Sequence, residues 1–298
     1  MTPSPRPVTS VEDVYHTVEG AGLPVRRAFP TTRRMQHDPF LLLDHFGPVS
    51  WAPGEASGVP DHPHRGFETV TYILEGAMEH RDSAGGGAVL RPGDVQWMTA
   101  GAGIVHAEMP EADFKRRGGV LHGFQLWVNL PATHKMAPPR YQDIAADRIP
   151  AATSADGRVT ARVIAGEALG ARARIDTHTP IGYVHFTLRP GASIDHPVAP
   201  EQNTFVYVFK GEIRAGADAV TVGTTRLALF GGGTAVRLAV PETASGPAEL
   251  ILLSGTPIGE PVARYGPFVM NTHQEIRQAV ADYQAGRMGR IRHGSTAQ

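Results

Sequence analysis

Short apolar runs separated by turn residues are the feature that most limits how this 298-residue chain can fold. Glu75-Gly76 and the sequence RPGD at residues 91–94 provide such turns, and the 34 glycines and 25 prolines suit many more. Strands this short and this regularly punctuated are typical of an antiparallel sandwich or barrel. In the first half the predicted strands are residues 69–74, 77–81, 88–90, 95–99, 104–108 and 121–129.

The same pattern returns in the second half, and one segment repeats. TVTYILEG at residues 69–76 matches TFVYVFKG at residues 204–211, and a His-Pro pair precedes each segment. A repeat on this scale indicates a duplicated domain. Residues 131–150 are rich in Pro, Ala and Asp and lack periodicity, which predicts a linker there. We therefore predict two domains, residues 1–135 and residues 136–298. The later strands are predicted at residues 158–165, 182–188, 204–209, 219–222, 226–230, 235–238 and 249–254.

The two ends of the chain depart from this pattern. Residues 1–30 look irregular except for residues 18–27, which are expected to enter a sheet. Near the C-terminus, Thr272 and Glu275 have the spacing of a capping box, and apolar residues then recur at helical spacing. We expect one amphipathic helix there, ending near Gly286 and packing against a barrel.

Charge and cysteine content exclude several classes of function. A formal net charge of -1 gives no electrostatic footprint for nucleic acid or an anionic membrane, so we expect neither as a partner. With no cysteine, disulfides, zinc–thiolate sites, iron–sulfur clusters and thiol nucleophiles are excluded, and a metal would need His, Asp and Glu. The start of the chain has no apolar leader and no membrane-length apolar run follows, so we expect a cytoplasmic protein. No heptad pattern is evident, and we expect a monomer.

One group of residues has the composition of a metal site. His62 and His64 alternate along a predicted strand, as do His106 and Glu108, and alternate residues of a strand share a face. Two such pairs on facing strands would bring three imidazoles and a carboxylate together inside a barrel. This donor set suits Fe(II), Mn, Ni, Cu or Zn. Glu68 is a rival carboxylate of the same strand parity, and spacing alone does not choose between it and Glu108.

Several other residues have two interpretations each. Arg65 is either a basic group at the rim of the site or part of a salt bridge. Residues 38–46, DPFLLLDHF, are expected to pack in the core. The residues that either line an aromatic pocket or fill the barrel core are Phe67, Trp97, Met98 and Phe124. The histidines expected to be structural or exposed include His80, His122, His134, His178 and His185.

The sequence resembles the pirin family of bicupins. The resemblance is carried by HPHRGFETVTYILEG from His62, PGDVQWMTAGAGIVHAEM from Pro92, DPFLLLDHFGP at residues 38–48, HRDS at residues 80–83 and YGPFVMNT at residues 265–272. It implies an all-β fold of two antiparallel cupin (jelly-roll) barrels with a short C-terminal helix. It also implies one metal, usually iron, in the first barrel only. The ligands that the resemblance implies are His62, His64, His106 and Glu108, which leaves Glu68 a supporting or structural role.

The second half departs from the metal pattern. A constant offset of 135 residues aligns Pro197 and Ala199 with the first two histidines, and Pro241 with the third. His196 and Glu201 remain as donors, and two donors seldom hold a metal unaided. We therefore predict a C-terminal barrel without a metal.

Members of the pirin family are associated with two kinds of function. The resemblance implies an Fe(II)-dependent quercetin 2,3-dioxygenase that opens a flavonol ring with O₂ and releases carbon monoxide and a depside. Glu108 would then be both a ligand and the general base that accepts the 3-hydroxyl proton. The alternative is a non-enzymatic, iron- or redox-dependent regulator that binds a transcription factor or a metabolic enzyme. A metal-stabilised scaffold without turnover is a third interpretation. The expected partners are thus an aromatic, flavonol-like small molecule and O₂, or a protein.

Overall fold

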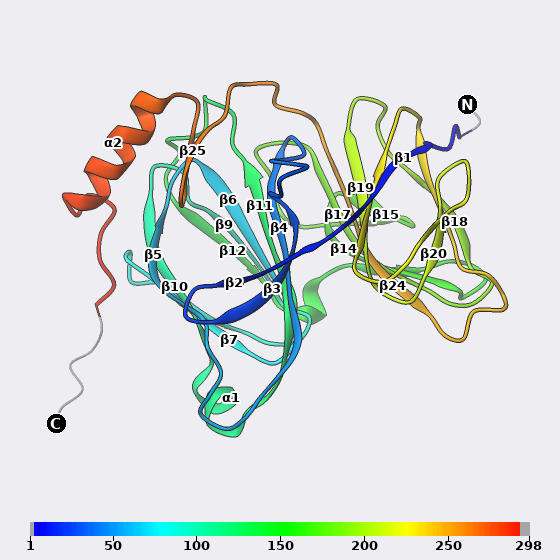
Figure 1. Cartoon of the computed structure of the whole chain (residues 1–298), viewed down its shortest axis with the longest axis horizontal. Helices are drawn as coiled ribbons and strands as arrows, with labels where there is room; N and C mark the ends of the chain where they lie inside the picture. Colours follow the sequence, from blue (N-terminus) through cyan, green and yellow to red (C-terminus); the bar gives the residue numbers. More distant parts are fainter. Residues whose placement is uncertain (1–2, 293–298) are drawn as a thin grey trace. The chain divides into compact units, whose positions relative to one another are not determined.

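The computed structural model describes residues 3–292, which form two compact units. The N-terminal barrel contains His16–Arg27, Phe40–Ala146 and the chain from Ile258 onward. The C-terminal barrel contains the chain up to Tyr15, Ala28–Pro39 and Asp147–Pro257. Each barrel is built from one seven-stranded and one four-stranded antiparallel sheet (Figure 1). The predicted fold class, two antiparallel cupin barrels with a short C-terminal helix, is confirmed.

The N-terminal barrel places its most buried strands at the centre of the larger sheet. Seven of the nine residues of β6 are buried because the strand lies between β9 and β11. The larger sheet has the order β12 (Arg140–Ile144), β9 (Val95–Thr99), β6 (Phe67–Glu75), β11 (Gly119–Asn129), β4 (Phe40–Trp51), β3 (Leu23–Phe29) and β2 (Tyr15–Glu19). The smaller sheet has the order β5 (Val59–His64), β10 (Ile104–Pro110), β7 (Met78–Asp82) and β8 (Gly87–Leu90).

The C-terminal barrel repeats this arrangement strand for strand. β19 occupies the place that β6 has in the first barrel, and these two strands carry the matching sequence segments. The predicted duplication is therefore visible in the topology. The larger sheet has the order β1 (Val8–Asp13), β22 (Arg226–Phe230), β19 (Asn203–Lys210), β24 (Ala248–Gly255), β17 (Ile181–Leu188), β14 (Val159–Ala165) and β13 (Ala151–Thr153). The smaller sheet has the order β18 (Ser193–Pro197), β23 (Ala235–Ala239), β20 (Ile213–Ala215) and β21 (Val220–Val222).

Short elements complete the secondary structure. β15 and β16 form a two-stranded sheet, as do β25 and β26, and a single 3₁₀ turn follows β12. A short helix, α1, comes between β10 and β11 and was not predicted from the sequence. The bounds of these elements are α1 (Ala112–Arg117), η1 (Ala146–Arg148), β15 (Glu167–Ala168), β16 (Ala171–Arg172), β25 (Ala263–Tyr265) and β26 (Phe268–Met270).

The N-terminal segment differs from its prediction. Residues 1–30 were expected to be irregular outside residues 18–27, but β1 and most of β2 form outside that stretch, whereas most of β3 lies within it, where a strand was expected. Strand β1 pairs with β22, which is distant in sequence, and β2 lies at a sheet edge, and both strands have largely exposed or half-buried side chains. Such strands lack the apolar alternation that marks a half-buried strand in a sequence.

The predicted linker also contains regular structure. Strand β12 lies within residues 131–150 and pairs with β9 of the N-terminal barrel. The two compact units interleave along the chain, whereas the predicted division is a single cut between residues 135 and 136. That cut remains a prediction about separate folding domains.

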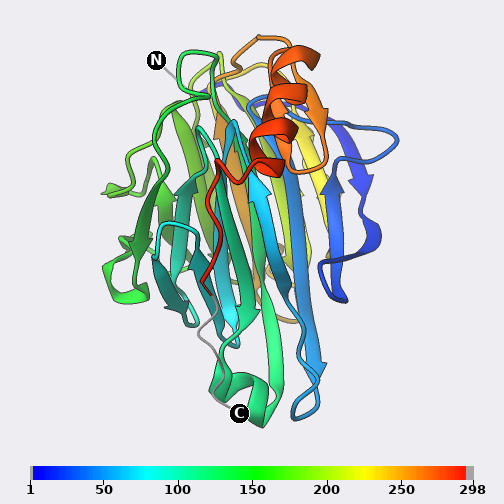
Figure 2. The same ribbon diagram turned by 90° about the vertical axis from the view of Figure 1, so that its left-hand side faces the viewer.

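The predicted C-terminal helix is present as α2 (His273–Gln284). Thr272 accepts a hydrogen bond from the backbone of Glu275, and the Glu275 carboxylate accepts one from the backbone of Thr272, which completes the capping box. Ile276 and Ala279 are buried in a cluster that includes Phe268 of β26. Figure 2 shows α2 lying across the β25–β26 hairpin. Within residues 3–292 no helix has both the length and the apolarity to cross a membrane.

Candidate metal centre

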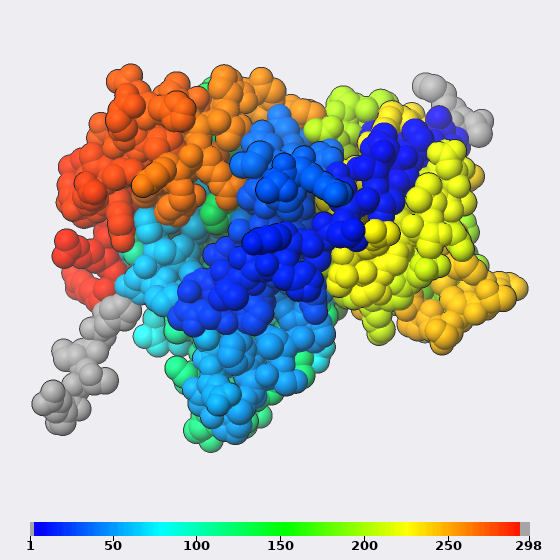
Figure 3. Space-filling view, viewed as in Figure 1, coloured from blue at the N-terminus to red at the C-terminus, as the bar shows by residue number. Residues whose placement is uncertain are grey.

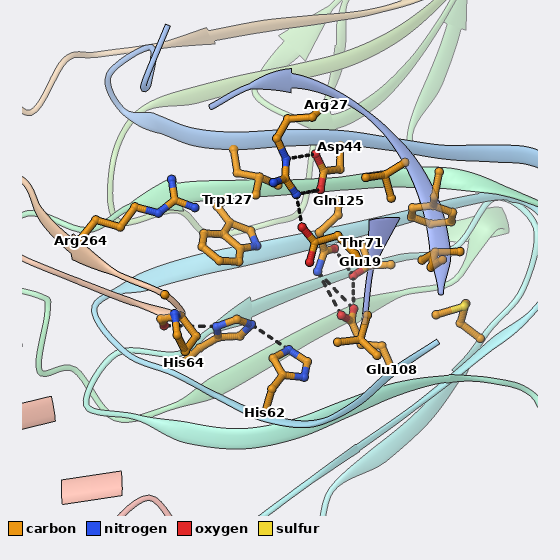
Figure 4. Close-up of a pocket in the computed structure, with 18 residues that line it drawn as sticks. Glu19, Arg27, Asp44, His62, His64, Thr71, Glu108, Gln125, Trp127 and Arg264 are labelled. Carbon is orange, nitrogen blue, oxygen red and sulfur yellow. Dashed lines mark hydrogen bonds and ion pairs between the residues drawn. The ribbon is translucent and has the colours of Figure 1, made fainter. Parts of the chain in front are cut away.

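Three of the predicted ligands converge in the N-terminal barrel. His62 and His64 lie on β5, and His106 lies on β10 directly opposite His62 in the strand register. The metal-ligating atoms of the three imidazoles all lie within 4.8 Å of one another. The two strands are hydrogen-bonded neighbours in the smaller sheet and do not face each other across the barrel, which corrects the predicted arrangement. Figure 4 shows His62 and His64 side by side at the wall of a cavity.

The Nδ1 atom of each imidazole is engaged on the side away from the cluster. Nδ1 of His62 lies 2.7 Å from the Pro60 carbonyl oxygen, and Nδ1 of His64 lies 3.4 Å from that of Pro267. Nδ1 of His106 lies 3.0 Å from Nε2 of His80. Contacts of this kind fix the orientation of a metal-binding imidazole, and they leave Nε2 as the metal-facing atom of all three rings.

The three Nε2 atoms fit a divalent metal ion. Nε2 of His106 is buried and has no hydrogen-bond partner, which is costly unless something else occupies it. Nε2 of His62 lies 3.0 Å from Nε2 of His64. Two nitrogens that are each about 2.1 Å from one ion are separated by about 3.0 Å when the angle at the ion is a right angle. Burial also holds the pKa of His64 and of His106 well below the usual value, so both rings are neutral and can donate a lone pair.

His80 and Tyr141 support this cluster. The Tyr141 hydroxyl lies 3.2 Å from Nε2 of His80, the same atom that contacts His106. His80 is buried on β7, whereas Tyr141 comes from β12, in the predicted linker. His80 thus has the structural role expected of it, and that role is to position His106. No signal in the sequence connects Tyr141 with this site, because the contact depends on the pairing of β12 with β9.

Glu108 lies beside the three imidazoles but has different contacts. Its Oε1 accepts a hydrogen bond of 2.9 Å from the Thr71 hydroxyl, and the Gln125 amide lies 3.2 Å from Oε2. The Thr71 hydroxyl also lies 2.7 Å from the Gln125 side-chain oxygen. Glu108 lines the same cavity as His62 and is not one of the three residues whose donor atoms are mutually close. Its role as a metal ligand remains a prediction.

Glu68, the rival carboxylate, is not part of the imidazole cluster. It is buried on β6 and accepts a hydrogen bond of 2.7 Å from the Thr99 hydroxyl. The even spacing between Glu68 and His64 does not place them on one face, because β5 and β6 belong to different sheets. Between them the chain turns at Gly66, whose φ of +88° is in the region that favours glycine.

A cavity of about 430 Å³ lies beside the imidazoles. Its wall combines apolar side chains with a few polar groups, as in many small-molecule sites (Figure 4). Of the two interpretations of Phe67, Trp97, Met98 and Phe124, the barrel-core one holds, because these side chains are fully buried and do not line this cavity. The aromatic lining residues are instead Trp127 and Phe46. The apolar lining residues include Leu23, Val25, Leu42, Phe46, Val59 and Met78.

Arg65 forms a salt bridge, as one of the two interpretations of this residue predicted. Its side chain is buried, with Nε donating to the Ala102 carbonyl oxygen and Nη1 lying 2.7 Å from Asp282 of α2. In Figure 3 the segment that contains β25, β26 and α2 (orange to red) lies beside the segment around β5 (cyan). Arg65 therefore fastens the C-terminal helix next to the strand that carries His64.

The C-terminal barrel has different residues at the corresponding positions. Strand register places His196 where His62 stands, and Val236 where His106 stands. The constant offset that aligned Pro197 and Pro241 with these histidines was wrong, because the second half has a longer segment from β18 to β19 than the first has from β5 to β6, and a shorter segment from β20 to β23 than the first has from β7 to β10. The prediction that this barrel binds no metal remains a prediction.

Comparisons with known proteins agree with this architecture. The chain matches the family model for pirin over residues 22–128 and that for the pirin C-terminal cupin domain over residues 183–289. A pirin-like protein from Solanum lycopersicum is 45% identical over 272 residues, which cover 91% of this chain and 89% of that protein. Pirin from Homo sapiens is 42% identical over 274 residues, covering 91% and 90%. The chain belongs to the pirin family.

A solved structure is similar to this chain over nearly its whole length. The crystal structure of a quercetin 2,3-dioxygenase from Acinetobacter baumannii matches with a TM-score of 0.89 at 36% sequence identity. The match covers 96% of this chain and 99% of that one. The family resemblance found in the sequence motifs is thereby confirmed.

Proposed function

We propose that this pirin-family protein is an Fe(II)-dependent dioxygenase that cleaves a quercetin-type flavonol with O₂. The observation that carries the proposal is the convergence of three imidazole Nε2 atoms, one of them buried without a partner, beside an apolar cavity. The similarity to a protein described as a quercetin 2,3-dioxygenase supports the same reaction class.

The metal would be held by His62, His64 and His106 through Nε2, with the Glu108 carboxylate as the fourth ligand. When bound, the metal lowers the pKa of a coordinated hydroxyl group and provides the electronic path for the reaction with O₂. The neutral imidazoles and the single carboxylate suit Fe(II), and also Mn, Ni, Cu or Zn, so the choice of iron rests on the family.

Glu108 would accept the proton of the flavonol 3-hydroxyl group. The hydrogen bonds from Thr71 and Gln125 hold its carboxylate toward the cavity, where a substrate hydroxyl can come within hydrogen-bond reach of about 2.6–3.2 Å. The apolar wall would bind the rings and displace water from the carboxylate. A drier environment strengthens the interactions of the charged groups in the site.

Turnover of quercetin by the iron-loaded protein tests the proposal. The protein is reconstituted with Fe(II) without air, quercetin and air are added, and loss of flavonol absorbance is followed together with release of carbon monoxide. We expect turnover in the wild type and none in the His62→Ala/His106→Ala double variant. A His196→Ala variant is the matched control and should turn over normally. Stoichiometric iron without any flavonol cleavage would overturn the proposal.

The role of Glu108 has its own test. A Glu108→Gln variant keeps the shape of the side chain and one oxygen that can accept from Thr71 or Gln125, but it cannot accept the proton. We expect it to retain most of its metal and to lose at least about a hundredfold in turnover. Full activity in this variant would remove Glu108 from the role of base.

A second candidate, a metal-dependent regulator, is favoured by one observation. The imidazole of His64 contacts Pro267, and the adjacent Arg65 is paired with Asp282 of α2, so the cluster is mechanically linked to a surface helix. A change of metal state could therefore alter the surface presented by α2. Capture of a defined partner that differs between iron-loaded and metal-free protein, in the absence of flavonol turnover, would favour this candidate.

A further inference from the structure

Two arginines line the cavity and differ in how their charge is balanced. Arg27 is paired with Asp44, at 2.8 Å and 2.5 Å, and with Glu19. Arg264 of β25 has no carboxylate within ion-pair distance among the residues the structure describes. Its Nη1 donates one hydrogen bond of 3.2 Å to the Leu41 carbonyl oxygen. One cavity arginine is therefore neutralised within the protein and the other is not.

The position of Arg264 is fixed by an aromatic side chain. Its guanidinium carbon lies 5.0 Å from the centre of the Trp127 ring, a cation–π contact. Trp127 is in turn held by Phe67 and His64, with ring centres 4.3 Å and 5.1 Å away. Figure 4 shows Arg264 and Trp127 on one side of the cavity and Glu108 on the other.

This arrangement leaves most of the donors of Arg264 available. A guanidinium has five N–H donors at its edge, and the contact with the indole uses only its face. Burial lowers the pKa of Arg264 and the positive charge of Arg27 lowers it further, while the more distant charges of Asp44 and Glu19 only partly offset this, so the guanidinium has no carboxylate in direct contact to balance its burial. A negatively charged ligand group would supply the missing interaction.

We propose that Arg264 is a specificity residue that binds a carboxylate on an aromatic ligand whose rings pack between Trp127 and the apolar wall. The preferred substrates of this site would then be aromatic acids, and a flavonol without such a charge would bind less well. This inference rests on the proposed function, because it assigns the substrate class of the same cavity, but it concerns binding and not turnover. An Arg–carboxylate contact is charge-assisted and is expected to change affinity by about tenfold or more.

Binding of a matched ligand pair tests the proposal without requiring catalysis. Naphthoate and its uncharged analogue naphthamide are titrated into the protein, and affinity is measured by calorimetry at neutral pH. We expect the wild type to bind naphthoate at least about tenfold more tightly than naphthamide. In Arg264→Gln this preference should fall to within about twofold, whereas Arg264→Lys should retain part of it because the charge remains.

Two comparisons keep the result specific. Naphthamide affinity should be unchanged in Arg264→Gln, which shows that the cavity is still folded. Arg116→Gln removes an exposed arginine of α1 in the same barrel and should keep the full preference. Each titration is repeated after metal chelation, because a metal can also bind a carboxylate. A preference that survives in Arg264→Gln, or that exists only with metal bound, would overturn the proposal. Failure of quercetin turnover alone would leave it intact.

Discussion

The two barrels have the same strand order and opposite interiors. In the C-terminal barrel a large cluster of aliphatic and aromatic side chains packs between the sheets, and a separate cavity has His196 and Ser254 in its lining. In the N-terminal barrel a smaller cluster packs part of the interior, and the rest is the cavity with its imidazoles, carboxylate and arginines. The fold therefore tolerates either a continuous apolar core or a polar site with the same backbone topology.

The difference extends beyond the metal ligands to the residues that support them. When the two barrels are aligned by their strand register, nearly every polar residue of the site corresponds to an aliphatic residue of the C-terminal core. The correspondences are His64 with Val198, Thr71 with Val206, His80 with Ala215, His106 with Val236, Glu108 with Leu238 and Gln125 with Leu252. Buried polar groups are favourable only when each has a partner, so ligands and supporting residues are present together or absent together.

Placing a site carboxylate in the C-terminal core should have the largest effect. A Leu238→Glu variant buries a carboxylate whose neighbours include Val206 and Leu252 in place of Thr71 and Gln125. We expect a loss of more than about 4 kcal/mol in the free energy of unfolding, measured with urea. The reciprocal Glu108→Leu change should cost less than about 1 kcal/mol, because Thr71 and Gln125 still bond each other. Similar losses in both variants would contradict the comparison.

Copying the C-terminal residue into the cluster should remove the metal. His106→Val reproduces Val236 and deletes one of the three converging nitrogens, so we expect metal affinity to fall by more than about a hundredfold. Metal content after dialysis against a competing chelator measures this. His196→Val is the matched control and should retain all of the metal. Equal losses in the two variants would mean that the cluster is not the binding site.

Replacing a supporting residue should have a smaller effect. Thr71→Val reproduces Val206 and removes the 2.9 Å hydrogen bond to Glu108 without touching a ligand. We expect about a tenfold decrease in metal affinity or in turnover. The same assays check this, with Thr204→Val in the C-terminal barrel as the control. If Thr71→Val had the metal affinity and turnover of the wild type, the Thr71 hydrogen bond would not be needed to orient Glu108.

The smallest expected effect concerns the ion pair between Arg65 and Asp282, which holds α2 against the N-terminal barrel. Among the described residues, the C-terminal barrel has no helix equivalent to α2. Hydrogen bonds from Arg65, then Arg287 and Gln278, lower the pKa of Asp282 from 3.8 to about 2. A lowered pKa stabilises the folded state above the unfolded value, and this contribution is lost as the pH falls from about 4 toward 2. Asp282→Asn should therefore cost about 1 kcal/mol at neutral pH, and the difference from the wild type should vanish in acid. Urea unfolding across this range measures both, and a gap independent of pH would contradict the assignment.

The sequence was informative where the chemistry is local. The alternation of His62 and His64 within one strand, and the strands at residues 95–99 and 226–230, could be predicted because their signals lie within a few residues. Tyr141 and Trp127 could not be assigned to the site because pairing between distant strands brings them there. Arg264 lies on a local hairpin that reaches the site through a bridge between Phe268 and Arg65, which are distant in sequence. Spacing also made Glu68 look like a possible ligand on the same face as His64. That inference failed because the chain passes from one sheet to the other at Gly66, and local spacing does not reveal such a change.

Metal binding in the N-terminal barrel is tested most directly by a crystal structure of the metal-loaded protein with anomalous scattering measured at the absorption edge of the metal. We expect one peak per chain, in contact with Nε2 of His62, His64 and His106, with the Glu108 carboxylate completing the set. We expect no peak beside His196. A peak in the C-terminal barrel, or a fully loaded protein whose metal does not contact these three nitrogens, would contradict this assignment.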